Sequence, residues 1–471
     1  MSKESSQGQK RLKELGLNEK SAWERLDARE KERVFAFCEG YKDFLTRAKT
    51  EREAIEAALE LAGRRGFKSL DGIKGPEPGT KFYLEWRGKV ALLGVWGQAP
   101  LEKGLHLVGA HVDAPRLDLK PQPLYEEAGL AMFKTHYYGG IKKYQWTALP
   151  LALHGVVILH DGRKINIKIG EDPGDPVLAI SDLLPHLAKD QMKKPLEEAF
   201  SGDDLNLVIG NLPYADEEVK EKVKLAILDQ LHRQYGLVEE DFISAELELV
   251  PAGPARDLGL DRSMIGAYGQ DDRVCAYTAL QAILELERPE RTALVLLVDK
   301  EEIGSTGNTG AQSRFLALAV TELAGRAGSA DILSVSRVLA SSRAISADVT
   351  AALDPTYEGV YDKRNVALLG RGVVLSKYSG SRGKYEANDA SAEFMGYLRR
   401  LFNAAGVIWQ TGELGKVDAG GGGTIAKYLA YFGLDVADCG PALLSMHAPL
   451  EIASKVDVYQ AYRAYSAFLK A

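Results

Sequence analysis

From about residue 265 onward, short apolar runs alternate with segments of helical periodicity, and this alternation constrains the fold more than any other feature. RVCAYTALQAILELE predicts a helix, TALVLLVDKEEIG a buried strand, AISADVTAAL a second strand and VYQAYRAYSAFLKA a closing helix, with a long helical region between the two strands. Strands connected through helices run mostly parallel, and the helices then cover both faces of the sheet. We therefore expect an α/β fold built on a largely parallel sheet.

The earlier part of the chain divides into segments of different character. Residues 1–65 are charged, with apolar residues spaced three and four apart, which predicts helices. KFYLEWRGKVALLGVWG and GLHLVGAHVDA predict strands, and LALHGVVILHDGRKINIKIG predicts two strands around an Asp-Gly turn. A charged helical stretch follows near residues 215–236. We interpret residues 1–110 and 255–471 as one discontinuous α/β domain, and residues 111–254 as a β-rich domain inserted into it.

Charge and composition argue against several classes of protein. The net charge of −7 disfavours a nucleic-acid binder that relies on bulk positive charge. No apolar run reaches the roughly 18–20 residues of a membrane span, and the start of the chain, MSKESSQGQKRLKELG, lacks the apolar stretch of a signal peptide. Cys38, Cys275 and Cys439 form no metal-binding or disulfide pattern. We expect a cytoplasmic protein whose metal ligands, if any, are histidines and carboxylates.

Five short segments place acidic or histidine side chains where strands end, which is where ligand sites form in open parallel sheets. In VGAHVDAP, His111 and Asp113 share one face of a strand, so Asp113 can accept the second imidazole N–H of His111. The alternative is an ordinary surface pair. In YGQDDRV, Asp271 and Asp272 precede a helix, where a carboxylate either caps the helix or bridges two cations.

The remaining three segments add further acids and a second histidine. In LLVDKEEIGSTGNTG a buried strand ends in Glu301 and Glu302, whose repulsion is costly unless a cation or a proton relieves it. One of them can bind a metal while its neighbour serves as a base, and the alternative is an exposed acidic turn. Asp348 in AISADVTAALDPTYEG follows a strand, and His447 in LLSMHAPLEIASKVD precedes a helix start. Each of these two can also be a structural turn residue.

Together the segments supply two histidines and three carboxylates, with a further carboxylate beside them. Imidazole and carboxylate ligands without thiolates suit Zn²⁺, with Mn²⁺ and Co²⁺ as alternatives, in a hydrolytic site. The ordered set GAHVDAPRLDLKP, GQDDRVCAYTAL, VDKEEIGSTGNTGA, SADVTAALDPTY and SMHAPLEIASKVD resembles the M18 aminopeptidases, from about residue 80 to the C-terminus. The resemblance implies a phosphorylase/hydrolase-like metallopeptidase domain interrupted by a β-rich domain, and a homododecamer built from dimers that encloses its active sites.

Carried over onto this sequence, the resemblance implies two divalent metal ions per subunit. Asp271 would bridge them, and the remaining ligands would be His111 and Asp348 for one metal, and Glu302 and His447 for the other. It further implies that Glu301 is the general base and that Asp113 orients His111. The peptide bond between Asp271 and Asp272 would be cis.

The resemblance also implies a catalytic contribution from a neighbouring subunit. VLAISDLLPHLAK matches the region of the inserted domain whose histidine reaches the next active site, which assigns that role to His186. The alternative is an ordinary histidine on a helix face.

The motifs identify the residues of the pocket for the first substrate residue less clearly than they identify the metal ligands. KYSGSRGKYEAND carries Arg382 and Lys384, and Arg382 matches best the basic residue that aspartyl aminopeptidases place there. The alternative is a solvated basic loop. The chain departs from the aspartyl aminopeptidases at Asp354-Pro355, where they have His-Pro, and in IKKYQWTALPL, where they have a Trp followed by Asp-Arg-Asp-Leu.

The expected function is therefore a two-metal aminopeptidase acting on short peptides. A preference for Asp or Glu at the first position is one expectation, and a neutral or basic preference is its alternative. Two further alternatives share the fold: a di-metal deacylase or carboxypeptidase, and a non-catalytic assembly or cargo-binding protein.

Overall fold

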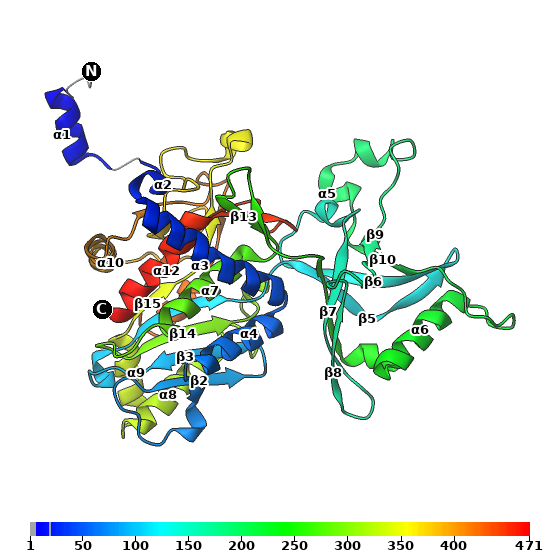
Figure 1. Cartoon of the computed structure of the whole chain (residues 1–471), viewed down its shortest axis with the longest axis horizontal. Helices are drawn as coiled ribbons and strands as arrows, with labels where there is room; N and C mark the ends of the chain where they lie inside the picture. Colours follow the sequence, from blue (N-terminus) through cyan, green and yellow to red (C-terminus); the bar gives the residue numbers. More distant parts are fainter. Residues whose placement is uncertain (1–5, 18–19) are drawn as a thin grey trace.

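The computed structural model describes residues 6–17 and 20–471, and its main body is built on a nine-stranded mixed sheet (Figure 1). In order across the sheet, the strands are β1 (Lys68–Ser69), β2 (Lys81–Trp86), β3 (Val90–Val95), β14 (Ala293–Val298), β4 (His106–His111), β15 (Arg343–Ser346), β21 (Asp435–Gly440), β17 (Val373–Ser376) and β19 (Trp409–Gln410). The four central strands, β14, β4, β15 and β21, run parallel to one another. β3 and β17 flank them in the antiparallel direction. The α/β fold class that the alternating segments predict is confirmed.

Helices cover the two faces of this sheet with separate hydrophobic clusters. On one face lie α3 (Ala28–Arg47), α4 (Glu51–Arg64), α7 (Gln270–Leu284), α10 (Ala392–Ala404) and α12 (Lys455–Lys470), and on the other lie α8 (Phe315–Arg326), α9 (Ile332–Ala340) and α11 (Ala426–Tyr431). Strand β14 contributes to both clusters, with Val295 and Leu297 on the first face and Leu294 and Leu296 on the second. A strand buried on both faces has no polar side, which explains its unbroken apolar sequence.

The helices expected in the first 65 residues are confirmed wherever the structure describes the chain. They are α1 (Gln7–Leu15), α2 (Ala22–Arg25), α3 and α4. Local sequence fixes where α3 and α4 begin, since Asp27 and Thr50 each accept a backbone N–H three residues on, and Glu30 and Glu53 each accept the cap residue's N–H in return. Within the described part of the chain, we find no helix that combines the length and the apolarity needed to cross a membrane.

A second, antiparallel sheet of seven strands lies to one side of the main body (Figure 1). Its order is β8 (Lys164–Ile169), β7 (Leu151–Ile158), β11 (Ala245–Pro251), β5 (Arg116–Glu127), β6 (Leu130–Tyr138), β10 (Leu207–Gly210) and β9 (Ala179–Ile180). Helix α6 (Lys222–Tyr235) packs against it through Val223, Ile227 and Leu231. All seven strands fall inside the segment expected to be inserted, while the exact division at 110/111 and 254/255 stays a prediction.

A third sheet was not anticipated from the sequence. Its five strands are β12 (Arg256–Leu258), β13 (Met264–Ala267), β23 (Glu451–Ser454), β22 (Ala442–Leu444) and β16 (Thr350–Ala351). AISADVTAAL was expected to form one strand, and that expectation was wrong: it divides into β15 in the nine-stranded sheet and β16 in the five-stranded sheet. Asp348 lies at the break, in the loop between the two strands. The break therefore brings the loop that carries Asp348 to the junction of two sheets.

Candidate metal centre

Three of the expected site segments converge at the carboxyl ends of central strands in the nine-stranded sheet. His111 is the last residue of β4, Asp348 follows β15, and Glu301 and Glu302 lie in a short 3-10 helix, η7 (Glu301–Ile303), after β14. These three strands are parallel neighbours in the sheet, so their carboxyl ends lie side by side. This is the position at which the fold class predicts a ligand site.

The five-stranded sheet delivers the other two expected ligands to the same place. Asp271 lies in the first turn of α7, shortly after β13, and its peptide bond to Asp272 is cis, as expected. His447 lies in the loop between β22 and β23 with φ of +65°, a backbone conformation that costs free energy for a residue with a side chain. Such outliers often cluster at functional sites, where surrounding structure holds them in place.

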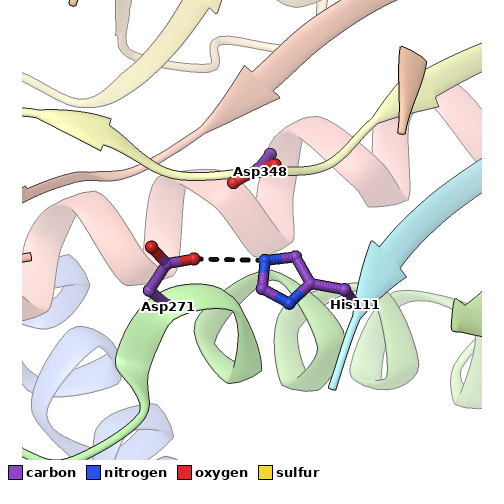
Figure 2. Close-up of side chains that lie close together, drawn as sticks. All are labelled: His111, Asp271 and Asp348. Atoms are coloured by element: carbon purple, nitrogen blue, oxygen red, sulfur yellow. Dashed lines mark ion pairs between the residues drawn. The ribbon is translucent and has the colours of Figure 1, made fainter. Parts of the chain in front are cut away.

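Asp271 lies between the two histidines, with one carboxylate oxygen toward each. Its Oδ1 is 3.2 Å from Nε2 of His111, and its Oδ2 is 3.1 Å from Nε2 of His447. Figure 2 shows the first of these contacts, with Asp348 near both side chains on the strand-to-loop segment opposite. Glu302 approaches from the His447 side, with Oε1 3.5 Å from Nε2. A carboxylate held between two imidazoles in this way can serve two cations at once.

The side chains fall into two overlapping groups, each able to hold a metal ion. His111, Asp271 and Asp348 form one group and Asp271, Glu302 and His447 the other, with the candidate ligand atoms of each group within 4.8 Å of one another. Oε1 of Glu302 is buried and has no hydrogen-bond partner among the described residues. Nε2 of His447 lies 3.5 Å from it, too far for a strong hydrogen bond. A buried carboxylate oxygen without a hydrogen bond is costly unless a cation satisfies it. The donor set and this atom therefore fit divalent cations.

Both histidines have their outer ring nitrogen engaged, which frees Nε2 for the centre of the site. Nδ1 of His111 lies 3.1 Å from the backbone oxygen of Asp113 and 3.3 Å from its Oδ1. Nδ1 of His447 lies 2.9 Å from the carbonyl oxygen of Gly140. Since these partners are acceptors, each Nδ1 carries a proton, and Nε2 is the nitrogen that a cation could take in place of its contact with Asp271.

Carboxylates outnumber cationic groups in the cluster, and the pKa values of Glu301 and Glu302 are raised accordingly. Burial, reinforced by the charges of Asp271 and Asp113, raises the pKa of Glu301 to about 7. Burial and Asp271 also raise the pKa of Glu302 well above its usual range. Burial opposes protonation of His447, but its hydrogen bond to Asp271 and the charge of Glu302 raise its pKa to about 10. This excess of buried negative charge is what divalent cations would neutralise.

Two supporting residues were not identified from the sequence. Glu451 is buried and accepts the backbone N–H of Asp271 at 3.1 Å and that of His447 at 2.8 Å. Tyr138, at the end of β6, donates its hydroxyl to Oδ2 of Asp113 at 2.8 Å. Glu451 stands inside the motif SMHAPLEIASKVD, but a glutamate at a strand start carries no sign that it supports a neighbouring histidine. Only the tertiary contacts identify these roles.

A cavity of about 490 Å³ opens beside the cluster. Arg382 and Lys384 both line it, together with residues of the Gly-rich segment 420–423. Lys384 is engaged by Asp389 at 2.8 Å and lies 3.9 Å above the ring of Tyr378. The side chain of Arg382 is exposed and has no ion pair among the described residues. Of the two predicted substrate contacts, Arg382 is therefore the more available cation.

His186 lies away from this cavity within a single chain. It belongs to an exposed segment between β9 and a short 3-10 helix, η4 (Gln191–Lys193), at the edge of the seven-stranded sheet. It does not line the cavity in the described part of the chain. Its expected role was in the site of a neighbouring subunit, so this role stays a prediction.

Comparison with known proteins places the chain in a family. The family model described as "Aminopeptidase I zinc metalloprotease (M18)" matches residues 44–469. The chain belongs to the M18 family. A "Probable M18 family aminopeptidase 1" of Clostridium acetobutylicum is 50% identical over 454 residues, which span 96% of this chain and 98% of that protein. This M18 protein is accordingly a metalloaminopeptidase that hydrolyses peptide bonds, as the sequence predicts.

Solved structures agree with the fold of this M18 aminopeptidase. The crystal structure of an M18 aminopeptidase from Thermotoga maritima matches with a TM-score of 0.93 and 47% identity, over 97% of this chain and all of that one. A more distant match, with a TM-score of 0.72 and 24% identity over 94% of this chain and 97% of that one, is a structure described as an mApe1 dodecamer of S. cerevisiae. The predicted metallopeptidase fold is confirmed.

Proposed function

We propose that this zinc aminopeptidase binds two divalent cations per chain, most readily Zn²⁺, and removes the N-terminal residue of short peptides. The observation that carries the proposal is the position of Asp271, whose two carboxylate oxygens each lie about one hydrogen-bond length from a different histidine. His111 and Asp348 would complete one metal site, and Glu302 and His447 the other. Mn²⁺ and Co²⁺ suit the same oxygen and nitrogen ligands.

When bound, a pair of such cations would supply Lewis acidity, which polarises the scissile carbonyl and lowers the pKa of water so that a base can deprotonate it for attack. Glu301 is the proposed general base. It would take a proton from the attacking water and deliver it to the leaving amine. The carboxylate of Asp113 accepts the backbone N–H groups of Glu301 at 3.1 Å and Glu302 at 3.2 Å, which supports a role in holding this acidic pair in place.

The free α-amine of the substrate would bind beside the metal-site carboxylates, which explains cleavage from the N-terminus. Asp271, Glu301, Glu302 and Asp348 all line the cavity, and their oxygens can accept hydrogen bonds from the N–H groups of such an amine. A blocked amine has fewer N–H groups and is bulkier. An acylated peptide would therefore bind poorly.

We also propose that the seven-stranded sheet mediates self-assembly into a homododecamer built from dimers. The structure described as an mApe1 dodecamer supports assembly in this fold. The segment near His186 exposes large apolar side chains, among them Leu184, Leu187 and Met192, as expected of a surface that a neighbouring subunit covers. In such an assembly His186 would donate a hydrogen bond to the developing oxyanion in the neighbouring subunit's site.

For the first substrate residue we propose a preference for Asp or Glu, carried by Arg382. A guanidinium that lines the cavity and has no ion-pair partner in the described chain can pair with an acidic side chain. One observation favours the alternative. Asp438 also lines the cavity, and its buried Oδ2 has no hydrogen-bond partner among the described residues, so a basic or polar side chain could donate to it.

A panel of aminoacyl-anilide substrates, assayed after chelation and readdition of Zn²⁺, tests this proposal. Hydrolysis that depends on added metal and disappears with N-acetylated substrates would support an N-terminal exopeptidase. Equal hydrolysis of blocked and free substrates would favour the deacylase or carboxypeptidase alternative. Faster hydrolysis of Lys than of Asp and Glu substrates would contradict selection by Arg382 and favour selection of a basic side chain by Asp438.

We further propose a cytoplasmic location. The support is chemical, because Cys38, Cys275 and Cys439 are all free and buried, as is usual for thiols of a reducing compartment.

A further inference from the structure

The carboxylate of Asp113 is surrounded by hydrogen-bond donors from three directions. Oδ1 accepts the backbone N–H of Glu301 and lies 3.3 Å from Nδ1 of His111. Oδ2 accepts the backbone N–H of Glu302 and, at 2.8 Å, the hydroxyl of Tyr138. Because the Asp113 side chain is fully buried, no solvent can replace a lost donor without rearrangement. The hydrogen bond from the hydroxyl of Tyr138 is the shortest of these contacts.

Tyr138 comes from the seven-stranded sheet and not from the sheet that carries His111. It is the last residue of β6, where it pairs with Arg116 at the start of β5. The guanidinium of Arg116 lies 3.9 Å from the centre of the Tyr138 ring, an arrangement favourable to a cation–π contact. Arg116 is in turn held by Asp118 at 2.8 Å and Glu248 at 3.1 Å. The position of the Tyr138 hydroxyl is therefore fixed by the seven-stranded sheet.

The two glycines that follow Tyr138 reach the other half of the centre. The carbonyl oxygen of Gly140 accepts the Nδ1–H of His447 at 2.9 Å. Gly139 has φ of +72°, and a Cβ at this position would lie 3.3 Å from Cβ of Glu302. The segment from Tyr138 to Gly140 thus contacts His447 directly, packs on Glu302 and reaches His111 through Asp113.

We infer that Tyr138 is a positioning residue for the metal centre, and that the segment Tyr138–Gly140 sets the orientation of both histidines from the seven-stranded sheet. This inference rests on the proposed two-metal function. Tyr138 acts through Asp113: its hydroxyl fixes the carboxylate, which fixes the ring of His111 and the backbone of Glu301. Groups that orient metal ligands in this way contribute to affinity and to turnover without touching the metal.

The test replaces Tyr138 by Phe, which removes the hydroxyl and keeps the ring beneath Arg116. Tyr137→Phe is the matched control, because Tyr137 precedes it on the same strand, points to the opposite face and is 43% exposed. Competition against a chromophoric chelator measures zinc affinity, and anilide hydrolysis at saturating zinc measures kcat and KM. We expect Tyr138→Phe to weaken zinc binding by about 10- to 100-fold and to lower kcat more than it changes KM. Tyr137→Phe should match the wild-type chain.

A double-mutant cycle checks that Tyr138 acts through Asp113. Asp113→Asn combined with Tyr138→Phe should weaken zinc binding no more than Asp113→Asn alone. Additive losses would overturn the inference, as would wild-type zinc affinity in Tyr138→Phe. A metal-free Tyr138→Phe chain that melts more than about 5 °C below the wild-type chain would mark Tyr138 as a structural residue and also overturn it.

The same titration separates this inference from the function on which it rests. A wild-type chain that binds fewer than two zinc ions would contradict the two-metal function, and the inference with it. Two zinc ions in the wild-type chain, with no difference between Tyr138→Phe and Tyr137→Phe, would overturn the inference alone.

Discussion

Asp271 presents one carboxylate oxygen to each of two histidines, with Oδ1 3.2 Å from Nε2 of His111 and Oδ2 3.1 Å from Nε2 of His447. If these oxygens bridge two cations, Asp271→Asn should weaken both zinc sites together, because an amide offers only one acceptor oxygen. His447→Gln should weaken one site more than the other. We expect Asp271→Asn to lower both affinities by more than about 100-fold, since changes to residues that only orient the ligands already cost about 10–100-fold. Competition against a chelator measures the two zinc affinities of each variant. Unchanged tight binding of two zinc ions in Asp271→Asn would contradict a bridging role for Asp271.

Glu301→Gln should separate metal binding from turnover. The substitution keeps the size of the side chain and removes its ability to accept and return a proton. We expect kcat to fall by about 10²- to 10⁴-fold, the usual contribution of a general base, while the zinc content stays at the wild-type value. Zinc analysis alongside steady-state kinetics checks both parts. A variant that retains its zinc and more than half of its turnover would remove Glu301 from the mechanism.

Arg382→Ala should alter the choice of the first substrate residue. Loss of a charge-assisted contact with an acidic side chain should lower kcat/KM for Asp and Glu anilides by about tenfold or more, with little effect on Leu anilide. Lys384→Ala is the control, because Asp389 and the ring of Tyr378 already engage the Lys384 ammonium group. An equal loss for acidic and neutral substrates in Arg382→Ala would mean that the residue supports the loop and does not select the substrate.

His106 should make the metal-free chain sensitive to acid. Its ring is buried in β4 and stacks on Phe468 at 4.7 Å, and burial, with Arg291 and Arg343 nearby, lowers its pKa to about 3. Between pH 6.5 and 3 the unfolded chain therefore binds the proton more readily, so stability falls as the pH falls through this range. At pH 5 the loss should be roughly 2 kcal/mol.

His106→Phe keeps a ring against Phe468 and removes this proton linkage. Melting curves of the metal-free protein at pH 7.5 and pH 5 should show a smaller loss in His106→Phe than in the wild-type chain. His160→Gln is the control, because the His160 side chain is 58% exposed. Equal acid losses in His106→Phe and the wild-type chain would show that His106 is not a source of the acid sensitivity.

The sequence predicted the main sheet well because its strands are buried on both faces and its helices have clear periodicity. The continuous apolar run of β14 and the helical periodicity of α12 were identifiable without tertiary information. The five-stranded sheet was not, because β16 and β22 have only two and three residues. Strands that short leave no periodic pattern. The division of AISADVTAAL at Asp348 was missed for the same reason.

The expected ligands converge because each follows a strand or begins an element whose place the fold dictates. Tyr138 and Glu451 could not be found in this way. Their contacts join segments 25 residues apart for Tyr138 with Asp113 and 180 residues apart for Glu451 with Asp271. In the sequence, nothing distinguishes a tyrosine at a strand end or a glutamate at a strand start from an ordinary surface residue. The role of His186 stays a prediction because it depends on a second subunit.

A zinc titration of the metal-free wild-type chain, followed by native mass spectrometry and by anilide hydrolysis in the same samples, tests the two-metal account most directly. The account predicts that chains carrying two zinc ions accumulate, and that activity reaches its plateau at two equivalents per chain, because Asp271 serves both sites. A plateau of activity at one equivalent, with no second zinc ion bound, would contradict it.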